Sequence, residues 1–571
     1  LYCIGFILIG SYKGILRHTS LDDVKNVLKA STSGLVLSLG VTAFLIIVGL
    51  GRLFPISILS FHYALTTLAL IGLRLVAKSI YLAGTQTKSD ATNLLIFGCG
   101  DSGIMTKNAF QQEQKGKFKV IGFLDDNANR WGKQLQDIQI HSPKAALSEE
   151  WVKKHNIDQL VIAIQTLSPS RKAEITEAAI ALGLEVKVVP PYRKWVDGSI
   201  TTNQLRKVKI EDLLQRNKIE LDNTNILGAV EGKSILVTGA AGSIGSEIAR
   251  QLSYYNVDKL ILIDHAESPL YDIEQELIEK YKSRKTVKPI CEVANVKDRY
   301  RMNVLFDTYK PQLVFHAAAY KHVPIIEKAP YEGIFVNVFG TRIVADLSME
   351  YGVEKFVMVS TDKAVNPTNV MGATKRVAEL YTQSLNEFGK TKFIATRFGN
   401  VLGSNGSVVP LFRKQIEAGG PITVTHEEIT RYFMTIPEAC NLVLEAGAMG
   451  KGGEVFVFDM GEPVKIMDMA EKMIRLSGLV LGKDIEIKVT GLRPGEKLYE
   501  ELLASSENTL PTHHPKILRA NVNTFSHNTI KEQLNLLTEI MIDGDVVGMV
   551  RKVKTIVPEY ISQNSEFEAL D

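Results

Sequence analysis

Two glycine-rich turns constrain the fold of this chain more than any other feature, because each follows an apolar run and precedes a helical segment. The first turn is Gly98-Cys-Gly-Asp-Ser-Gly103, and the second is Thr238-Gly-Ala-Ala-Gly-Ser-Ile-Gly245. A strand that passes through glycines into a helix is typical of α/β units with a parallel sheet. We therefore predict an α/β protein with two Rossmann-like parallel-sheet domains.

The chain has 571 residues, which is too long for one ordinary domain. The sequence pattern predicts transmembrane helices at 1–80, a first Rossmann-like domain at 90–192, a linker at 193–232, a second Rossmann-like domain at 233–505 and a C-terminal tail at 506–571. The linker and the tail are polar and only weakly periodic. We expect one or two helices in the tail and assign it no function.

The apolar runs Gly34–Leu50 and Pro55–Leu73 are each about long enough to cross the roughly 30 Å hydrocarbon layer of a membrane. We interpret both as transmembrane helices, and the alternative is a buried hairpin in a soluble domain. Arg52 lies between the runs, and the basic residues outside them are Lys13, Arg17, Lys25, Lys29, Arg74 and Lys78. Both outer flanks, and all that follows, are therefore expected in the cytoplasm. Leu1–Gly10 is too short to span, so the sequence is expected to begin inside a helix.

The composition excludes some classes of partner. A net charge of +3 and a pI near 8.4, without a face-sized cluster of lysine and arginine, argue against nucleic-acid binding. The cysteines Cys3, Cys99, Cys291 and Cys440 show no C-x-x-C or metal-ligand spacing. We interpret them as reduced thiols of a cytoplasmic protein.

The first α/β unit carries a dinucleotide-type pattern. A strand at Leu94–Phe97 leads through the first glycine turn into a helix at Ile104–Gln114, and the next strand ends at Asp125 and Asp126. Glycines admit a pyrophosphate at a helix N-terminus, and an acid after the next strand can hold a ribose. The same turn can also be a tight strand-to-helix connection, so both nucleotide binding and a structural or regulatory role remain open.

The second unit has the spacing T-G-x-x-G-x-x-G, with glycines at Gly239, Gly242 and Gly245. The helix that begins near Ile244, just after Ser243, directs its positive end at a phosphate held there. The next strand ends at Asp264, about 25 residues after the first glycine, where a carboxylate can accept from both adenosine ribose hydroxyls. That charge repels a 2′-phosphate, and His265 rather than arginine follows, so the pattern favours NAD over NADP.

The strand that begins at Leu313 leads into small residues and then into Lys321 and His322. The small residues let a cofactor lie close to the backbone, and they are Ala317, Ala318 and Ala319. Lys321 and His322 are expected to project toward the far end of the cofactor. His316 lies nearby, but no acid or thiol stands at ligand spacing, so we predict no metal site.

A hydroxyl, an acid and an amine stand together at Thr361, Asp362 and Lys363, directly behind the apolar run Phe356–Val359. Ligands of an open parallel sheet bind beyond the carboxyl ends of its strands, so this triplet is expected to face a ligand. A helix is predicted to start between Met371 and Lys375, with its first turn directed at the same pocket. A solvated loop beside a buried strand is the alternative.

These motifs resemble the extended short-chain dehydrogenase/reductases, and among them the membrane-bound UDP-N-acetylglucosamine 4,6-dehydratases of bacterial glycan and capsular polysaccharide biosynthesis. The resemblance covers nearly the whole chain. Its most specific part is Ser360-Thr-Asp-Lys-Ala-Val with Met371-Gly-Ala-Thr-Lys375, where most relatives carry Tyr-x-x-x-Lys. It implies that the second domain is an extended short-chain dehydrogenase/reductase with a small C-terminal substrate lobe.

The resemblance also implies further binding residues. Asn295, followed by Val296, stands where relatives have the acid that contacts adenine, so this contact is less certain. Thr396–Gly403 is similar to the family's sugar-nucleotide segment, in which Asn400 holds a diphosphate oxygen. Arg431, Arg493 and Glu496 lie in the expected substrate lobe. A guanidinium at Arg493 suits bidentate phosphate or ribose recognition, and a surface salt bridge is the alternative.

For a hexose 4,6-dehydration, we assign Asp362 as the acid for the C6 hydroxyl, Lys363 as the C5 base and Thr361 as a hydrogen bond to the C4 oxygen. Lys375 is expected to hold the nicotinamide ribose. A lysine base requires a lowered pKa, and we expect burial and nearby Lys375 to lower that of Lys363. Met371 cannot take a proton, so the usual role of tyrosine at C4 passes to Asp362, Thr361 or water.

The resemblance implies NAD as cofactor and UDP-N-acetylglucosamine as substrate. It also implies a homo-oligomer with a lipid bilayer as partner. The protein is then expected to be a multi-pass protein of the bacterial inner membrane, with its catalytic domains in the cytoplasm. A UDP-hexose 4-epimerase is the nearest alternative, since it shares fold, cofactor and first hydride step. A membrane-anchored regulator that senses NAD or sugar nucleotide without turnover is a second. A membrane phosphosugar transferase is disfavoured, because the helices lead into a dehydrogenase-like domain.

Overall fold

The computed structural model describes residues 2–9, 21–51, 54–84, 91–113, 117–190, 205–208, 210–213, 224–284, 287–501, 509–522 and 525–571. The chain forms two compact units. The first consists of Leu1–Leu167 and Leu182–Lys207, and the second of Ser168–Ala181 and Val208–Asp571.

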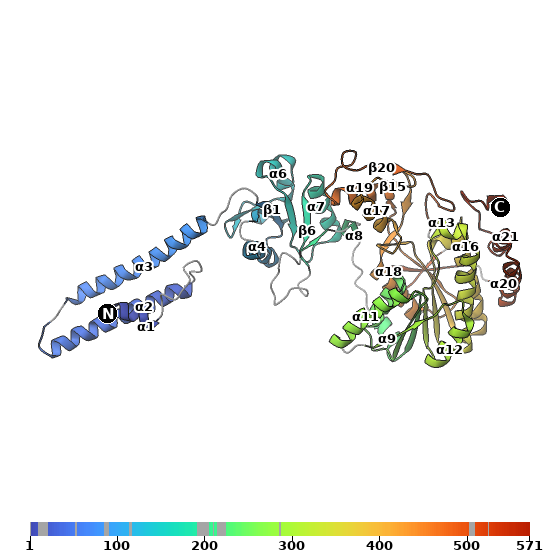
Figure 1. Cartoon of the computed structure of the whole chain (residues 1–571), viewed down its shortest axis with the longest axis horizontal. Coiled ribbons are helices and arrows are strands. Elements are labelled where there is room, and N and C mark those ends of the chain that lie inside the picture. The colour runs from blue at the N-terminus through green and yellow to red at the C-terminus, as the bar shows by residue number, and fades with distance from the viewer. Residues whose placement is uncertain are drawn as a thin grey trace. The chain divides into compact units, whose positions relative to one another are not determined.

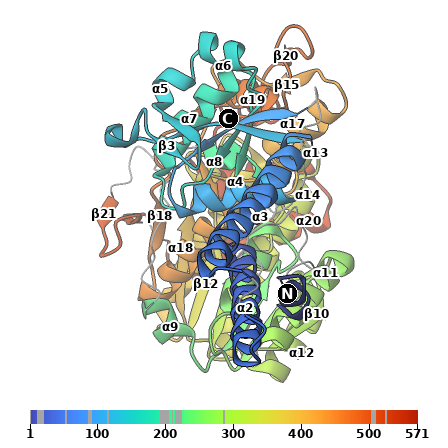
Figure 2. The ribbon, with the colours of Figure 1, turned by 90° about the vertical axis from the view of Figure 1, so that its left-hand side faces the viewer.

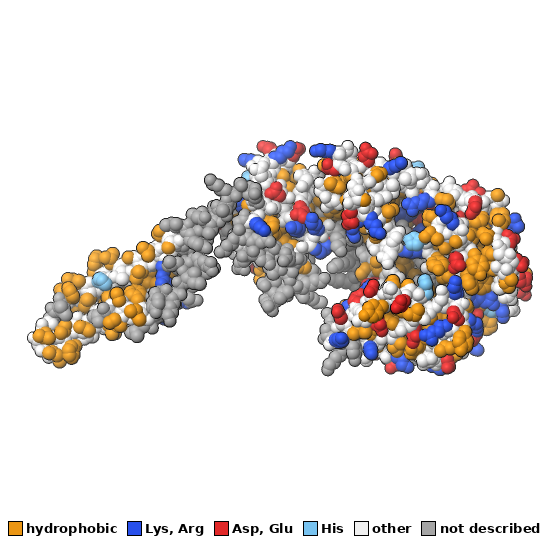
Figure 3. Space-filling view, viewed as in Figure 1, with side chains coloured by type: hydrophobic (Ala, Val, Ile, Leu, Met, Phe, Trp, Pro, Cys, Tyr) orange, Lys and Arg blue, Asp and Glu red, His pale blue; other side chains and the backbone are white. Residues whose placement is uncertain are grey.

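The first unit begins with the helices α1 (Tyr2–Ile9), α2 (Leu21–Ile47) and α3 (Ile56–Gly84). Val24–Ile47 and Ile56–Arg74 are long and apolar enough to cross a membrane. Hydrophobic side chains cover these helices (Figure 3), and Phe44, Phe61 and Leu68 are exposed. Such apolar surface on a helix pair fits a lipid environment better than water. Three basic residues used to predict the orientation, Lys13, Arg17 and Arg52, lie outside the described residues.

The first unit continues with a sheet of order β3-β4-β2-β1-β5-β6-β7. Its strands are β1 (Thr92–Phe97), β2 (Phe118–Leu124), β3 (Gln134–Leu135), β4 (Ile138–His141), β5 (Gln159–Ile162), β6 (Glu185–Val188) and β7 (Arg206–Lys207). Its helices are α4 (Asp101–Glu113), α5 (Pro143–Ala146) and α6 (Glu149–His155). The strands β4, β2, β1, β5 and β6 are parallel, and the short β3 and β7 pair antiparallel at the edges. The predicted Rossmann-like pattern is therefore present.

The second unit contains a sheet of order β10-β9-β8-β11-β12-β13-β18-β22-β21. Its strands are β8 (Ser234–Thr238), β9 (Lys259–Asp264), β10 (Pro289–Val293), β11 (Leu313–His316), β12 (Lys355–Val359), β13 (Lys392–Arg397), β18 (Val455–Phe458), β21 (Thr509–Pro511) and β22 (Ile517–Ala520). All pairs from β10 to β18 are parallel, and β22 and β21 close that edge antiparallel. The predicted fold class, α/β with parallel sheets, is confirmed.

Helices cover both faces of this sheet (Figure 1). One face packs against α9 (Thr224–Val230), α10 (Ser243–Leu252), α11 (Glu267–Arg284) and α18 (Ile436–Met449). The other packs against α12 (Arg299–Tyr309), α15 (Thr341–Glu350) and α16 (Val370–Ser384). The unit also contains the helices α7 (Pro169–Ala181), α8 (Ile210–Leu213), α13 (Val323–Lys328) and α14 (Pro330–Gly333). Since both faces are covered, the strands read as continuous apolar runs.

The residues after 505, expected as a polar tail, contribute to the core instead. β22 pairs with β18, and the helices α20 (His527–Ile542) and α21 (Val546–Ile556) contact α16, beside which they lie in Figure 1. Leu534 and Val550 are fully buried in this contact, and all fifteen residues of α16 are buried. Likewise α9, within the expected linker, buries Ile226 and Val230 against the sheet. In α20, buried positions recur every three to four residues, a weak signal in a polar segment.

A small lobe adjoins the carboxyl edge of the second sheet. Its strands are β14 (Asn400–Leu402), β15 (Ile422–Val424), β16 (Thr430–Arg431), β17 (Phe433–Thr435), β19 (Val464–Lys465) and β20 (Ile487–Val489), and its helices are α17 (Val408–Glu417) and α19 (Ile466–Leu476). Figures 1 and 2 both show α17, α19, β15 and β20 gathered together. This lobe lies where the resemblance predicted a substrate lobe.

Candidate active site

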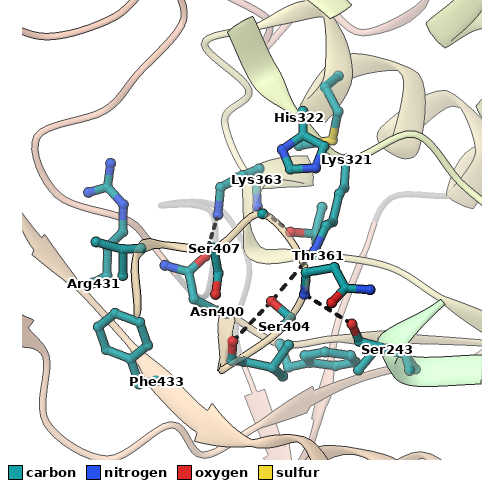
Figure 4. A pocket seen from close by; sticks show the side chains of 18 of the residues that line it. Ser243, Lys321, His322, Thr361, Lys363, Asn400, Ser404, Ser407, Arg431 and Phe433 are labelled. Atoms are coloured by element: carbon teal, nitrogen blue, oxygen red, sulfur yellow. Dashed lines mark hydrogen bonds between the residues drawn. The ribbon is translucent and has the colours of Figure 1, made fainter. Parts of the chain in front are cut away.

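A cavity of about 640 Å³ opens in the second unit, between the carboxyl ends of β8, β11 and β12 and the small lobe. Most of the side chains predicted to bind or react line it together. They are Gly239, Gly242, Ser243, Ile244, Gly245, Ala317, Ala319, Lys321, His322, Thr361, Lys363, Met371, Lys375, Asn400, Arg431, Arg493 and Glu496. Figure 4 shows several of them converging from the glycine turn, the triplet after β12 and the small lobe.

The second glycine turn has no room for side chains. Gly239 has a φ of +67°, and a Cβ there would lie 2.6 Å from the backbone nitrogen of Ala318. A Cβ on Gly245 would lie 2.1 Å from the carbonyl oxygen of Gly239. The turn therefore requires glycine, and it presents the N-terminus of α10, which begins at Ser243, to the cavity. Such a cradle fits a dinucleotide diphosphate.

Asp264 ends β9 beside this turn. Its carboxylate accepts hydrogen bonds from the backbone N–H groups of Ala241 and Ala266, both at 2.9 Å. Asp264, Asn295, Val296 and Ala318 do not line the cavity. The side chain of Asn295 accepts from the backbone of Lys297, and Val296 is buried. The contacts predicted for these residues with an adenosine thus stay predictions.

The triplet after β12 forms one hydrogen-bonded group. Thr361 caps the short helical turn Asp362–Ala364. Oδ1 of Asp362 accepts from the hydroxyl of Thr361 at 2.9 Å and from Nζ of Lys363 at 3.0 Å. Nζ of Lys363 also donates to Oδ1 of Asn400 at 3.2 Å. Thr361 and Lys363 face the cavity, whereas the side chain of Asp362 is fully buried behind them.

The expected lowering of the Lys363 pKa is wrong. Burial alone would lower it, but the carboxylates of Asp362 and Glu500 outweigh burial and raise the pKa of Lys363 above its ordinary value. Glu500 lies 3.5 Å from Nζ. Burial lowers the pKa of Lys375 instead, to about 8. Lys363 therefore rests as an ammonium, and any basic role depends on a proton moving to a neighbour.

Lys375 and Met371 lie on α16, one turn apart on the side that faces the cavity. Asn369 caps this helix by accepting from the backbone of Gly372 at 2.8 Å. A Cβ on Gly372 would lie 2.1 Å from the carbonyl oxygen of Lys363, so the helix packs directly onto the turn Asp362–Ala364. The fold thus holds Lys363 and Lys375 in one pocket.

A buried ion network lies behind these groups. Glu379 of α16 accepts from Ser360 at 2.6 Å and from Arg397 at 2.9 and 2.7 Å, and it pairs with Arg376 at 3.2 Å. Although burial opposes ionisation, Arg397 and Arg376 hold the pKa of Glu379 at about 2. The network joins β12, β13 and α16 immediately below the reactive triplet. Nothing in the local sequence identified it, because its members meet only in the folded sheet.

Lys321 and His322 stand at the cavity wall after β11, and the pKa of each is lowered, first by burial and then by the neighbouring cation. Nζ of Lys321 lies 3.5 Å from the hydroxyl of Ser404. Both ring nitrogens of His316 are bonded to the hydroxyls of Thr238 and Thr341, and burial lowers its pKa to about 3. His316 is therefore a neutral, satisfied core side chain.

Arg431 lines the cavity, but its donors are directed into the small lobe. They reach the carbonyl oxygens of Thr430, Leu498 and Lys497, at 2.7 to 3.3 Å, and Oε1 of Glu496 at 3.4 Å. Arg431 therefore holds the segment 496–498 in place. This structural role is separate from any contact that it makes with a substrate. Arg493 is exposed, and its backbone N–H donates to Glu496.

A parallel sheet whose first strand leads through this glycine turn into a helix is the arrangement of dinucleotide-binding α/β folds, and the Met-x-x-x-Lys and Thr-Asp-Lys segments lie at the same cavity. The chain belongs to the polysaccharide biosynthesis protein family, whose profile matches residues 235–522.

Three relatives narrow this class. The chain is 44% identical to the capsular polysaccharide biosynthesis protein CapD of Staphylococcus aureus, over 93% of this chain and 87% of CapD. It is 34% identical to a UDP-N-acetylglucosamine 4,6-dehydratase (inverting) of Campylobacter jejuni, over 49% of this chain and 80% of that enzyme. It is 33% identical to a UDP-glucose 4-epimerase of Rickettsia canadensis, over 48% and 79%. The chain is thus related to nucleotide-sugar dehydratases and epimerases.

Proposed function

We propose that the protein is an NAD-dependent 4,6-dehydratase that converts UDP-N-acetylglucosamine to a UDP-4-keto-6-deoxy-N-acetylhexosamine for polysaccharide or glycoprotein glycan synthesis. The observation that carries this proposal is the acid-amine pair of Asp362 and Lys363, 3.0 Å apart, whose amine faces a cavity walled by the glycine turn. An elimination at C5 and C6 needs a proton donor and a proton acceptor at one place, and this pair supplies both.

The cavity fits NAD, because Gly239 and Gly245 leave no space for side chains where a diphosphate would approach the backbone. The residues that would hold it are Gly239, Gly242, Ser243, Ile244, Gly245, Asp264, Asn295, Val296, Ala317, Ala318, Ala319 and Lys375. The chemistry that NAD supplies when bound is acceptance of the C4 hydride and its return to C6. The cycle is redox-neutral, so the cofactor need not leave.

The first proton step would begin at Thr361. Its hydroxyl takes the C4 hydroxyl proton and passes its own proton to Oδ1 of Asp362, to which it already donates a hydrogen bond. Asp362 is buried and does not touch the cavity, so it receives the proton only through Thr361. Thr361 and Asp362 together thus provide the proton acceptor for the C4 hydroxyl, which the thioether of Met371 cannot be.

The elimination would run through Lys363. Its ammonium gives a proton to the C6 hydroxyl, which leaves as water with the electrons of the C6–O bond. The amine so formed takes the C5 proton, and the electrons of the C5–H bond form the C5–C6 double bond. When the hydride reaches C6, Lys363 returns a proton to C5. Asp362 then passes its stored proton to the amine across 3.0 Å, which restores the ion pair.

This scheme changes the roles assigned from the sequence: Thr361 takes the C4 proton, and Lys363 serves as both the C6 acid and the C5 base. Asp362 was expected to protonate the C6 hydroxyl directly, and its burial makes it a proton store for Lys363 instead. The substrate diphosphate and sugar would lie toward Lys321, His322, Asn400, Arg493 and Glu496, with Arg431 organising that wall.

The two apolar helices favour a membrane-bound protein. We propose that it lies in the inner membrane of a bacterium with its catalytic domains in the cytoplasm. A lipid bilayer is then a partner, and we propose a homo-oligomer.

A UDP-hexose 4-epimerase is the second candidate, favoured by the epimerase relative and by the shared first hydride step. An epimerase needs no proton donor for C6. The decisive experiment incubates the full chain with UDP-N-acetylglucosamine in deuterated water. A dehydratase yields a product lighter by one water, with deuterium at C5, whereas an epimerase yields an isomer of unchanged mass without deuterium there. An absence of any product would favour a regulator without turnover.

A further inference from the structure

Glu500 is a buried acid beside the reactive amine. Its side chain is 3% exposed, and Oε1 lies 3.5 Å from Nζ of Lys363 and 3.6 Å from Nε of Arg431. Its other oxygen, Oε2, is buried and has no hydrogen-bond partner among the described residues. An unsatisfied buried carboxylate oxygen is costly, so a structural role alone does not account for it.

The surroundings hold Glu500 in place. Arg431 fastens the carbonyl groups of Lys497 and Leu498, directly before it. The amine of Lys497 donates to the carbonyl oxygen of Val365 at 3.0 Å, so the segment is attached to the loop that follows Lys363. Glu500 is not one of the residues that line the cavity, and the cavity-lining amine beside it is that of Lys363. It therefore acts on the reaction only through Lys363.

Charges of both signs surround Lys363. Its ammonium pairs with Asp362 and Glu500, and Arg431 pairs with Glu500 and Glu496. Lys321 is a further cation near enough to interact electrostatically with Lys363. Asp362 becomes neutral in the proposed cycle when it stores the C4 proton. At that stage Glu500 is the carboxylate that still holds the ammonium.

We infer that Glu500 is a positioning residue of the reaction: its carboxylate holds the Lys363 amine between Asp362 and Asn400 and keeps the ammonium in place while Asp362 is protonated. The expected change in kcat rests on the proposed dehydration. The effect of Glu500 on the Lys363 amine does not rest on it, because the two side chains already lie together in the resting protein.

The test compares the wild-type full chain with Glu500→Gln, which keeps the shape and removes the charge, and with Glu500→Asp, which keeps the charge. Glu501→Gln is the matched control, since Glu501 accepts from Asn366 and does not contact Lys363. Acetylation of Lys363 by acetic anhydride is followed by mass spectrometry across pH, and kcat and KM are measured with UDP-N-acetylglucosamine.

For Glu500→Gln we expect the labelling midpoint of Lys363 to move to lower pH by about 1–3 units. We expect kcat to fall roughly 10- to 100-fold with KM nearly unchanged, because a misplaced amine affects the proton steps more than binding. In Glu500→Asp, both the labelling midpoint and kcat should lie between those of Glu500→Gln and the wild type. In Glu501→Gln, both should match the wild type.

The inference would be overturned if the labelling midpoint of Lys363 is unchanged in Glu500→Gln. It would also be overturned if that variant raises KM and leaves kcat unchanged. If Glu500→Gln does not fold, the test rests on Glu500→Asp, in which the carboxylate is withdrawn from Lys363 by one methylene. A kcat equal to that of the wild type would then overturn the inference. A reduced kcat, with the charge retained, would support it. If the wild type forms no product, the proposed function fails, and the labelling midpoints still test the effect of Glu500.

Discussion

The two α/β units build their glycine turns alike. A Cβ on Gly103 would lie 2.0 Å from the carbonyl oxygen of Gly98, and one on Gly245 would lie 2.1 Å from that of Gly239. The acid after the second strand is also held alike. Asp125 accepts from the backbone of Cys99 and Asn127, and Asp264 accepts from that of Ala241 and Ala266.

The units differ in what surrounds these turns. In the first unit Asp125 also accepts from the thiol of Cys99 at 2.7 Å and pairs with Arg130 at 3.2 Å, so its carboxylate already has a cationic partner. In the second unit the turn after β12 supplies Lys363, and helix α16, which packs on that turn, supplies Lys375. A glycine turn therefore predicts local geometry, whereas chemistry depends on which side chains end the adjacent strands.

The largest expected effect is loss of turnover in the second unit. Lys363→Ala and Asp362→Asn should each abolish formation of the 4-keto-6-deoxy sugar, by at least about 10²- to 10⁴-fold, because each removes a member of the proton cycle. NAD extracted from the purified protein should be unchanged, since neither side chain is part of the glycine turn. Near-normal turnover in either variant would remove the assignment.

The next effect concerns stability. Glu379→Gln should lower the free energy of unfolding by about 3–5 kcal/mol, because it removes the buried carboxylate that pairs with Arg397. The pKa of Glu379 lies at about 2, against 4.5 when unperturbed, so its contribution is present above about pH 4.5 and is lost as pH falls toward 2.

The matched change in the first unit is Glu185→Gln, whose carboxylate is 40% exposed and pairs with Lys207. It should cost about 0–1 kcal/mol. Denaturant unfolding followed at pH 7 and pH 4 measures both variants. Equal losses in the two units would contradict the view that the network below the reactive triplet has a special structural weight.

A third effect sharpens the comparison of the turns. Gly239→Ala should reduce the NAD retained by the protein at least about tenfold, because the new Cβ would strike the backbone of Ala318 at a φ of +67°. Gly100→Ala is the control in the first unit, where nothing lies within 4 Å of the added carbon. Circular dichroism checks that both variants fold. Retained NAD in Gly239→Ala would show that the turn is not the cofactor cradle.

Much of this architecture could be predicted from the sequence, because strands, glycine turns and strand-end polar residues are local signals. The predicted strand at Leu94–Phe97 lies within β1, and Thr361 and Lys363 reach the cavity as expected. The ion pair of Lys363 with Glu500 could not be predicted, since the two meet only through the small lobe. The pKa of Lys363 was misjudged for the same reason: burial is visible in a sequence pattern, and a distant counter-charge is not.

The smallest expected effect tests whether the first unit takes part in the chemistry at all. Asp125→Asn should leave turnover and retained NAD unchanged, because Asp125 is already paired with Arg130, whereas Asp264→Asn should weaken NAD retention, because Asp264 stands beside the cofactor cradle. The amide oxygen introduced by Asp125→Asn can still accept from the backbone of Cys99, so the turn should persist in that variant. NAD content and product formation are measured for both variants under the same conditions. A loss of either in Asp125→Asn would mean that the acid paired with Arg130 serves a nucleotide after all, and that the two glycine turns are alike in function as well as in geometry.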